Sequence, residues 1–316
     1  MSSILLREKL LGGLWGAIIG DALGVPVEFK SRKEIARVPV TDMRGYGAHH
    51  QPVGTWSDDS SLLICTVESL LNGFDTHDLG QRFVRWLEQG YWTPWGQVFD
   101  VGIATRDAIH RIAQGTVAEQ AGGSSEQSNG NGSLMRILPV ALRFADAPAR
   151  DLAEYAQRAS YLTHRHPRSQ MACGLYSLLV AALLHGASPE DAYPEAIRQA
   201  QAIYQQPPYS VEWQHFARLL SGQIACIPEA DISATGYVIH TLESSVWCLL
   251  NTESFEQAVL KAVNLGDDTD TTGTVTGGLA GVCYGLAAVP SRWLNQLARH
   301  DDLSKLFNVF AANISG

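Results

Sequence analysis

The nine residues LGDDTDTTG, from Leu265 to Gly273, carry three carboxylates and three threonines. Carboxylates packed this densely repel one another unless a positive charge lies among them, and hard oxygen ligands at this spacing suit Mg²⁺, Mn²⁺ or Ca²⁺. Asp and Thr also cap helices, so a solvated capping turn is the alternative interpretation. We call this stretch, residues 265–273, the second acidic segment.

A first acidic segment, Gly54 to Ser60 (GTWSDDS), contains the same residue types far upstream. Two such clusters indicate one shared cation site. If they do share a site, no domain boundary can lie between them, so we expect residues 1–316 to form a single domain although their number would allow two.

Glycines are frequent in the stretches that would have to bring these segments together. The helical pattern of Ile4–Ala22 contains four glycines, and the stretch Gly273–Leu286 contains several more that leave one face almost free of side chains. Glycine costs helix propensity, so its use here is the close approach of another backbone. We therefore expect these two segments to pack closely and to join the acidic segments.

Composition narrows the class of protein. Hydrophobic residues make up 46% and charged residues 17% of the chain, as in a globular protein with a large core. The net charge is −9 and no Lys/Arg block occurs, which argues against nucleic-acid and anionic-membrane binding. A phosphate-bearing substrate would need bound cations and a few local arginines.

Cysteines and apolar runs predict the compartment. The five scattered cysteines are typical of reduced core residues, and the N-terminus shows no secretion signal. The longest apolar run, Met171–Leu184, is shorter than the roughly 20 residues that span a bilayer. We expect a cytoplasmic protein without a membrane segment.

Helical periodicity runs through the chain, and no stretch shows convincing strand alternation, so the predicted fold class is all-α. The glycine-rich stretch Gly122–Gly132 is predicted to be a functional loop. The predicted helices are Ile4–Ala22, one opened by Asp58 and Asp59 and closed by Asn72-Gly73, Asp78–Glu88, one that follows Asp100 and runs to about Ala113, Leu134–Ala145, Ala149–Leu162, Ser169–His185, Pro189–Gln205, Glu212–Leu220, Gly236–Leu250, Phe255–Val263 and Gly273–Leu286.

Five motifs in succession resemble the ADP-ribosylglycohydrolase family, which includes the dinitrogenase-reductase-activating glycohydrolase and the ADP-ribosylhydrolases. They are GDALG with Glu28, WSDDS (56–60), NGSLMR (131–136), LTHRHP (162–167) and GDDTDT (266–271). The resemblance covers nearly the whole chain. It implies one all-α domain that holds two Mg²⁺ or Mn²⁺ ions and cleaves the bond between ADP-ribose and a protein side chain.

The resemblance also implies roles for individual residues. Glu28 would touch the metals or activate the water, and Asp100 would serve in proton transfer; which is the acid and which the base stays open. The implied metal ligands are Ser57, Asp58, Asp59, Asp268, Asp270 and Thr271.

A substrate-binding set follows from the same resemblance: Asn131, Gly132, Ser133 and His164 would lie near the ADP-ribose. The alternative for Ser133 is a helix cap. His164 and His166 also raise the possibility of zinc, but no further Cys or His stands at ligand spacing. Trp56 is expected either in the cleft wall or in the core, and His49 and His50 are expected in solvent.

Two positions depart from the family pattern. Ser57 replaces the usual Thr and keeps a hydroxyl, whereas Asp267 replaces the usual Gly. An extra acid at 267 would change metal affinity or simply face water.

The sequence therefore predicts a hydrolase that removes ADP-ribose from protein, with arginine as the preferred linkage. Its partner would be an ADP-ribosylated protein, modified either by a regulatory ADP-ribosylating enzyme or by a toxin. The alternatives are a hydrolase of serine-linked or small-molecule ADP-ribose conjugates, and a non-catalytic binding or crystallin-like relative.

Overall fold

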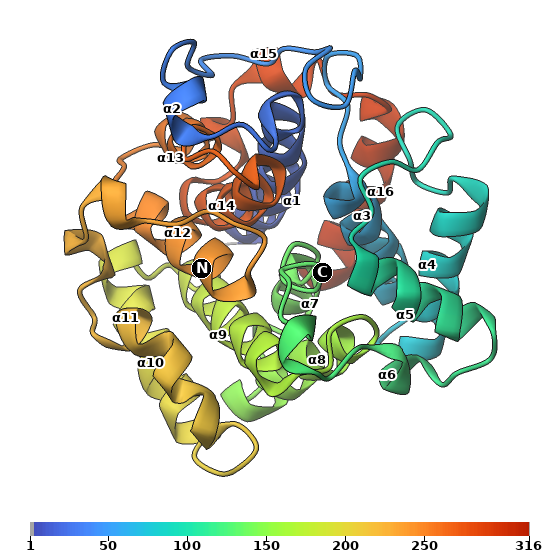
Figure 1. Ribbon diagram of the computed structural model, residues 1–316, viewed down its shortest axis with the longest axis vertical. Coiled ribbons are helices and arrows are strands. Elements are labelled where there is room, and N and C mark those ends of the chain that lie inside the picture. The colour runs from blue at the N-terminus through green and yellow to red at the C-terminus, as the bar shows by residue number, and fades with distance from the viewer. Residues whose placement is uncertain (1–2, 316) are drawn as a thin grey trace.

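The computed structural model describes residues 3–315 as one compact assembly of helices joined by loops (Figure 1). Within these residues only two isolated β-bridges occur and no strand, so the predicted all-α class is confirmed. The α-helices are α1 (Ser3–Gly24), α2 (Arg32–Ile35), α3 (Asp58–Leu70), α4 (Thr76–Gln89), α5 (Ile103–Ala113), α6 (Ala118–Ala121), α7 (Leu138–Arg143), α8 (Ala149–Tyr161), α9 (Pro167–Leu184), α10 (Pro189–Ile203), α11 (Ala217–Leu220), α12 (Val238–Leu250), α13 (Phe255–Val263), α14 (Thr269–Tyr284), α15 (Ser291–Leu294) and α16 (His300–Ser315). Short 3₁₀ helices lie at Val25–Val27, Glu126–Ser128, Ser210–Phe216, Ile224–Cys226, Glu229–Asp231 and Leu286–Ala288.

Helices α1 and α14 lie against each other backbone to backbone, as the glycine spacing predicted (Figure 1). Three glycines of each helix face one another in antiparallel order, and a Cβ added to any of these six would overlap a backbone atom of the other helix. The facing pairs are Gly12 with Gly281, Gly16 with Gly277, and Gly20 with Gly273. The C-terminal end of α1 therefore lies beside the N-terminal end of α14.

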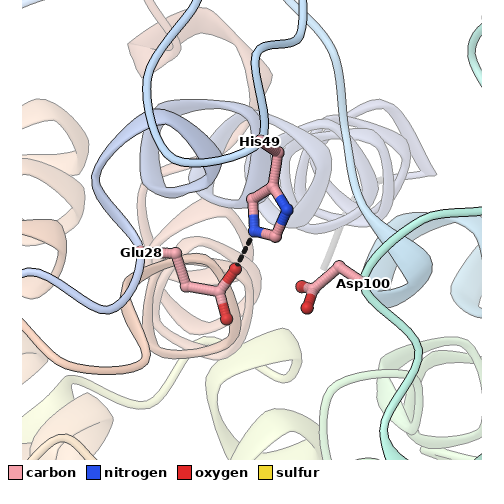
Figure 2. A group of neighbouring side chains, drawn as sticks. All are labelled: Glu28, His49 and Asp100. Carbon is pink, nitrogen blue, oxygen red and sulfur yellow. Dashed lines mark hydrogen bonds and ion pairs between the residues drawn. The ribbon is translucent and has the colours of Figure 1, made fainter.

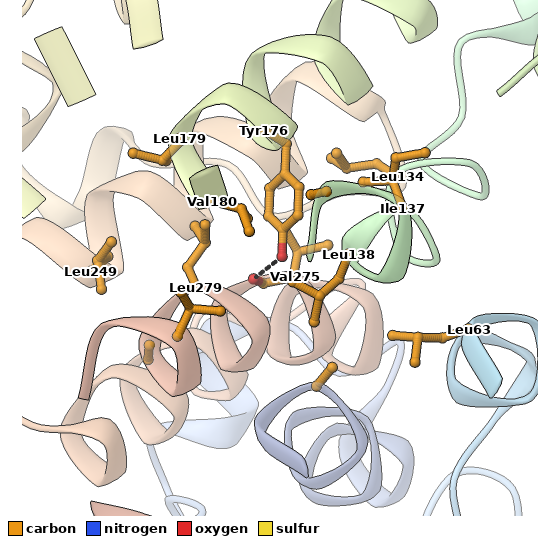
Figure 3. Close-up of a cluster of buried hydrophobic side chains, with 14 of the residues drawn as sticks. Leu63, Leu134, Ile137, Leu138, Tyr176, Leu179, Val180, Leu249, Val275 and Leu279 are labelled. Carbon is orange, nitrogen blue, oxygen red and sulfur yellow. Dashed lines mark hydrogen bonds between the residues drawn. The ribbon is translucent and has the colours of Figure 1, made fainter. Parts of the chain in front are cut away.

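Helix α9 packs on this pair from the other side. Its side chains are buried almost all around, as expected for a central helix. Tyr176 reaches from α9 to α14, where its hydroxyl donates to the Val275 carbonyl at 3.3 Å, and leucines from α3, α7, α9 and α14 surround this contact (Figure 3). A smaller apolar cluster lies under α3, α4 and α5.

Residues Ser3–Val27 are long and apolar enough, by length and composition alone, to span a membrane. That run is longer than the Met171–Leu184 stretch on which the sequence argument relied. All of its apolar window is buried inside the protein. In this fold, α1 is the central core helix.

Several predicted boundaries shift. Helix α14 starts at Thr269 instead of Gly273, so the second acidic segment forms its N-terminus. Of the predicted helix Leu134–Ala145, only Leu138–Arg143 is α-helical (α7), because the residues before it form a turn. The predicted helix Glu212–Leu220 is divided between a 3₁₀ helix and α11. Helix α16 was not predicted, although it packs on α1.

The α1–α14 contact gives a stability prediction. Gly16→Ala should destabilise the protein by at least about 3 kcal/mol, the upper end of the usual cost of overpacking, because the new methyl meets a backbone carbonyl that cannot move aside. Urea unfolding measures this change. Gly102→Ala is the matched control, since its Cβ would meet only Thr105 Oγ1 at 4.0 Å. Equal stability of the two variants would contradict the prediction.

Candidate active site

One cavity of about 440 Å³ collects most of the predicted site residues from distant parts of the chain. Its walls come from the loop after α1, the start of α3, the start of α5, the turn before α7 and the start of α14. The predicted residues that line it are Glu28, Asp58, Asp59, Asp100, Asn131, Gly132, His164, Asp268 and Thr271. The described residues that line it include no lysine or arginine, so local arginines do not neutralise a substrate phosphate by direct contact, contrary to expectation.

The first acidic segment is held in place by Asp21. This carboxylate is fully buried and accepts the backbone N–H groups of Ser57 and Ser60 at 3.0 Å and the Ser60 hydroxyl at 2.5 Å. Asp21 lies in the last turn of α1, and it caps the N-terminus of α3. Its negative charge thus meets the positive end of a helix dipole.

The two acidic segments meet at one side of the cavity, lined by Asp58, Asp59, Asp268 and Thr271, which we call the cavity floor. Thr271 Oγ1 lies 3.4 Å from Asp59 Oδ1, and Thr269 Oγ1 donates to the Gly24 carbonyl at 2.8 Å. Ligand oxygens of Glu28, Asp268 and Asp270 lie within 4.8 Å of one another. The structure thus brings the two acidic segments together, as the sequence predicted, and their use as a shared cation site stays a prediction.

Three carboxylates at or beside this floor each have one buried oxygen without a hydrogen-bond partner. Asp268 Oδ2 accepts from Asn131 Nδ2 at 2.9 Å, and Asp270 Oδ1 accepts the Thr271 N–H at 2.9 Å. The buried oxygens left unpaired are Asp59 Oδ2, Asp268 Oδ1 and Asp270 Oδ2. Unpaired buried carboxylate oxygens are costly, and a divalent cation is the natural partner for such a set.

The protonation of this floor reflects burial and crowding. Burial, followed by the neighbouring acids, raises the pKa of Asp58, Asp59 and Asp270 well above the ordinary value. Burial also raises the pKa of Asp268. Together these shifts favour either protons or metal ions among the carboxylates.

Glu28 faces two groups from other loops (Figure 2). Burial, with the nearby charge of Asp100, raises the pKa of Glu28 to about 10. His49 Nε2 is hydrogen-bonded to Glu28 Oε2, and the His49 ring lies between Phe29 and Phe99 at centroid distances of 5.9 and 5.3 Å. His49 is therefore part of the site and not solvated as predicted; no sequence signal marked it, because its partner lies 21 residues away in a separate loop.

The predicted substrate-binding residues separate into two groups. Gly132 and His164 face the cavity, and Asn131 lines it while its amide holds Asp268 and Thr241. Ser133 is fully buried, accepts the Ser160 hydroxyl at 2.9 Å and does not line the cavity.

The remaining site positions have local roles in the fold. Ser57 is the N-cap of α3, where its Oγ accepts the Asp59 N–H at 3.2 Å. Asp267 is exposed, so its carboxylate faces water. Its φ of 60° is a left-handed conformation, which explains why Gly suits this position. Trp56 is fully buried in the core and does not line the cavity.

The histidines of the LTHRHP motif point to different places. His166 lies near Glu126 and Glu212, a group that has metal-ligand spacing. The Arg168 guanidinium forms ion pairs with both of these carboxylates and would repel a cation there. His164 is instead directed toward the main cavity, so the two histidines do not form a zinc site.

Comparison with known proteins identifies the family and relatives of this chain. The ADP-ribosylglycohydrolase family profile matches residues 2–315. The ADP-ribosylarginine hydrolase Tri1 of Serratia proteamaculans is 31% identical, with 95% of this chain and 78% of that protein covered. The ADP-ribosyl-dinitrogen reductase glycohydrolase of Rhodospirillum rubrum is 30% identical over 92% and 91% of the two chains.

The solved structure of an ADP-ribosylglycohydrolase-related protein complex superposes with a TM-score of 0.82 and 32% identity, and covers 98% of this chain and 99% of that one. The match thus extends over nearly the whole helical scaffold. This chain belongs to the ADP-ribosylglycohydrolase family of enzymes.

Proposed function

We propose that this protein is a metal-dependent hydrolase that removes ADP-ribose from arginine side chains of modified proteins. The observation that carries the proposal is a set of three carboxylates, Asp59, Asp268 and Asp270, each with one buried oxygen that has no partner. Asp59 and Asp268 line the cavity, and a ligand oxygen of Asp270 lies within 4.8 Å of those of Asp268 and Glu28. The arginine linkage is supported by relatives named ADP-ribosylarginine hydrolase in two bacteria.

The residues present fit a divalent cation site. All candidate donors are oxygens, which Mg²⁺ and Mn²⁺ prefer, and their ligand atoms come from two helix N-termini and one loop. Two such ions would be held by Asp58, Asp59, Asp268, Asp270 and Thr271, with Ser57 at the edge. Bound ions would supply Lewis acidity and orient the ribose hydroxyls.

The carboxylate pair Glu28 and Asp100 handles the protons of the reaction. Hydrolysis breaks the bond between the ribose C1″ and the guanidine nitrogen, so one carboxyl must take a proton from water while another gives a proton to the leaving nitrogen. Burial and the nearby charge of Asp100 raise the pKa of Glu28 to about 10, which favours the protonated form of Glu28 while no cation is bound beside it.

His49 orients Glu28 for this step. Its ring is fixed between two phenylalanines, and its Nε2 contacts the Glu28 carboxylate. The Glu28 loop is also tied to the second acidic segment, since the Phe29 N–H donates to the Asp267 carbonyl and the Asp267 N–H donates to the Lys30 carbonyl, both at 2.8 Å.

Activity should depend on the unpaired oxygens. Asp270→Asn should lower kcat for release of ADP-ribose from an arginine-modified protein by at least about 100-fold, because a neutral amide cannot replace a charged cation ligand. Asp267→Asn is the matched control and should retain wild-type turnover, since Asp267 faces solvent. Full activity of Asp270→Asn would refute the metal proposal. Release from serine-linked substrate alone would refute the arginine linkage.

The stability of the folded protein, and the amount by which Mg²⁺ raises it, should both depend on pH. The raised pKa values mean that the metal-free protein binds protons more tightly when folded, so its stability falls as pH rises above the ordinary carboxylate range. We expect excess Mg²⁺ to raise Tm more at pH 8 than at pH 5.5, because protons compete with the ion.

Differential scanning fluorimetry with and without a chelator measures this effect. The double variant Asp59→Asn/Asp270→Asn should lose the Mg²⁺ response and show a shallower pH slope, because Glu28, Asp58 and Asp268 keep raised pKa values. A non-catalytic relative without a metal site would show no Mg²⁺ or ADP-ribose response in the wild type, which would reject the proposed function.

A further inference from the structure

Arg136 is a buried cation without a counter-ion. Its side chain is fully buried, and among residues 3–315 it forms no ion pair. Nη2 donates to the Ala159 carbonyl at 3.1 Å and to Thr163 Oγ1 at 2.8 Å, while Nε and Nη1 have no partner. Burial lowers the pKa of Arg136 to about 10, which leaves the guanidinium charged at neutral pH. Burying a charge without a counter-ion destabilises the folded state, so a functional role for Arg136 is worth considering.

Thr163 connects this cation to His164. Thr163 Oγ1 accepts from Arg136 and lies 2.9 Å from His164 Nδ1. Thr163 is fully buried, so its hydroxyl hydrogen stays unpaired unless it is donated to Nδ1. The arrangement that satisfies every group therefore has Nδ1 as the acceptor and the ring proton on Nε2.

The charge state of the ring agrees with this tautomer. Burial, together with the Arg136 charge, lowers the pKa of His164 to about 3. The imidazole is thus neutral over the physiological range, and it offers one hydrogen-bond donor.

His164 Nε2 lies at the part of the cavity wall formed by Gly130 and Gly132, which we call the glycine wall. A Cβ on Gly130 would lie 3.3 Å from His164 Nε2, and a Cβ on Gly132 would lie 2.8 Å from Cε1. Both glycines and His164 line the cavity, away from any direct lysine or arginine contact. This wall is a place where an anionic ligand group meets only neutral donors.

Building on the proposed function, we propose that Arg136 and Thr163 are positioning residues that lock His164 as an Nε2–H donor to the diphosphate of bound ADP-ribose. The buried guanidinium adds a positive field behind this wall. A ligand whose ribose binds the metal ions among the carboxylates would place its diphosphate against this wall. The locked tautomer makes His164 a donor at all times and never a competing acceptor.

The test combines calorimetry with nitrogen NMR on the full chain. ADP-ribose is titrated in the presence of Mg²⁺ into wild type, Thr163→Val, Thr163→Ser and Arg136→Met, and two-bond ¹H–¹⁵N spectra report the His164 tautomer without ligand. Thr66→Val is the matched control, because Thr66 is an equally buried threonine that bonds only the Leu62 carbonyl.

We expect wild-type His164 to show Nε2–H and no titration between about pH 5 and 8. Thr163→Val and Arg136→Met should mix the tautomers and weaken ADP-ribose binding by about fivefold to tenfold, the worth of one hydrogen bond. Thr163→Ser should restore both readouts, and Thr66→Val should change neither.

Three results would overturn the inference: an Nδ1–H or charged ring in the wild type, wild-type affinity in Thr163→Val, or no rescue by Thr163→Ser. A wild type that binds no ADP-ribose refutes the proposed function instead, and the tautomer spectra still report on the lock in that case.

Discussion

The close contact between α1 and α14 is the constraint on which the rest of the structure depends. Facing glycines let the two backbones touch, so the end of α1 reaches the start of α14 with no side chain between them. Thr269 closes this junction by bonding the Gly24 carbonyl. Asp21, one turn earlier, then receives the N-terminus of α3. Three helix ends are fixed around one point, and the acidic floor of the cavity lies there.

The cavity combines an acidic region with a region lined by neutral residues. Two helix N-termini, α3 and α14, direct their dipoles at the acidic floor and offset part of the repulsion among its carboxylates. No described lysine or arginine lines the glycine wall, and the buried Arg136 lies behind it, bonded to Thr163. The acidic region and Arg136 both contain buried charged atoms without hydrogen-bond partners. Such unsatisfied atoms are expected where a binding site is formed before its ligand binds.

The sequence predicted the parts of the site that are local. Asp58 and Asp59, and Asp268 and Asp270, stand beside each other in the chain at helix starts, so their convergence needed only one additional contact, which the glycines signalled. His49 could not be predicted in the same way, because its position depends on a loop that folds back over Glu28. The turn before α7 similarly placed Ser133 against Ser160 and away from the cavity, although its neighbour Gly132 lines it.

By itself, the sequence determined the all-α class, the two acidic segments and the glycine faces, because these follow from residue type and spacing along a helix. Only the tertiary structure decided which oxygens of those acids remain unpaired, that Asp21 supports α3, and that His49 and Arg136 act on the cavity from separate elements. The physical reason is that a helix face is encoded locally. A hydrogen-bond partner many residues away is chosen by how the loops and helices pack around it.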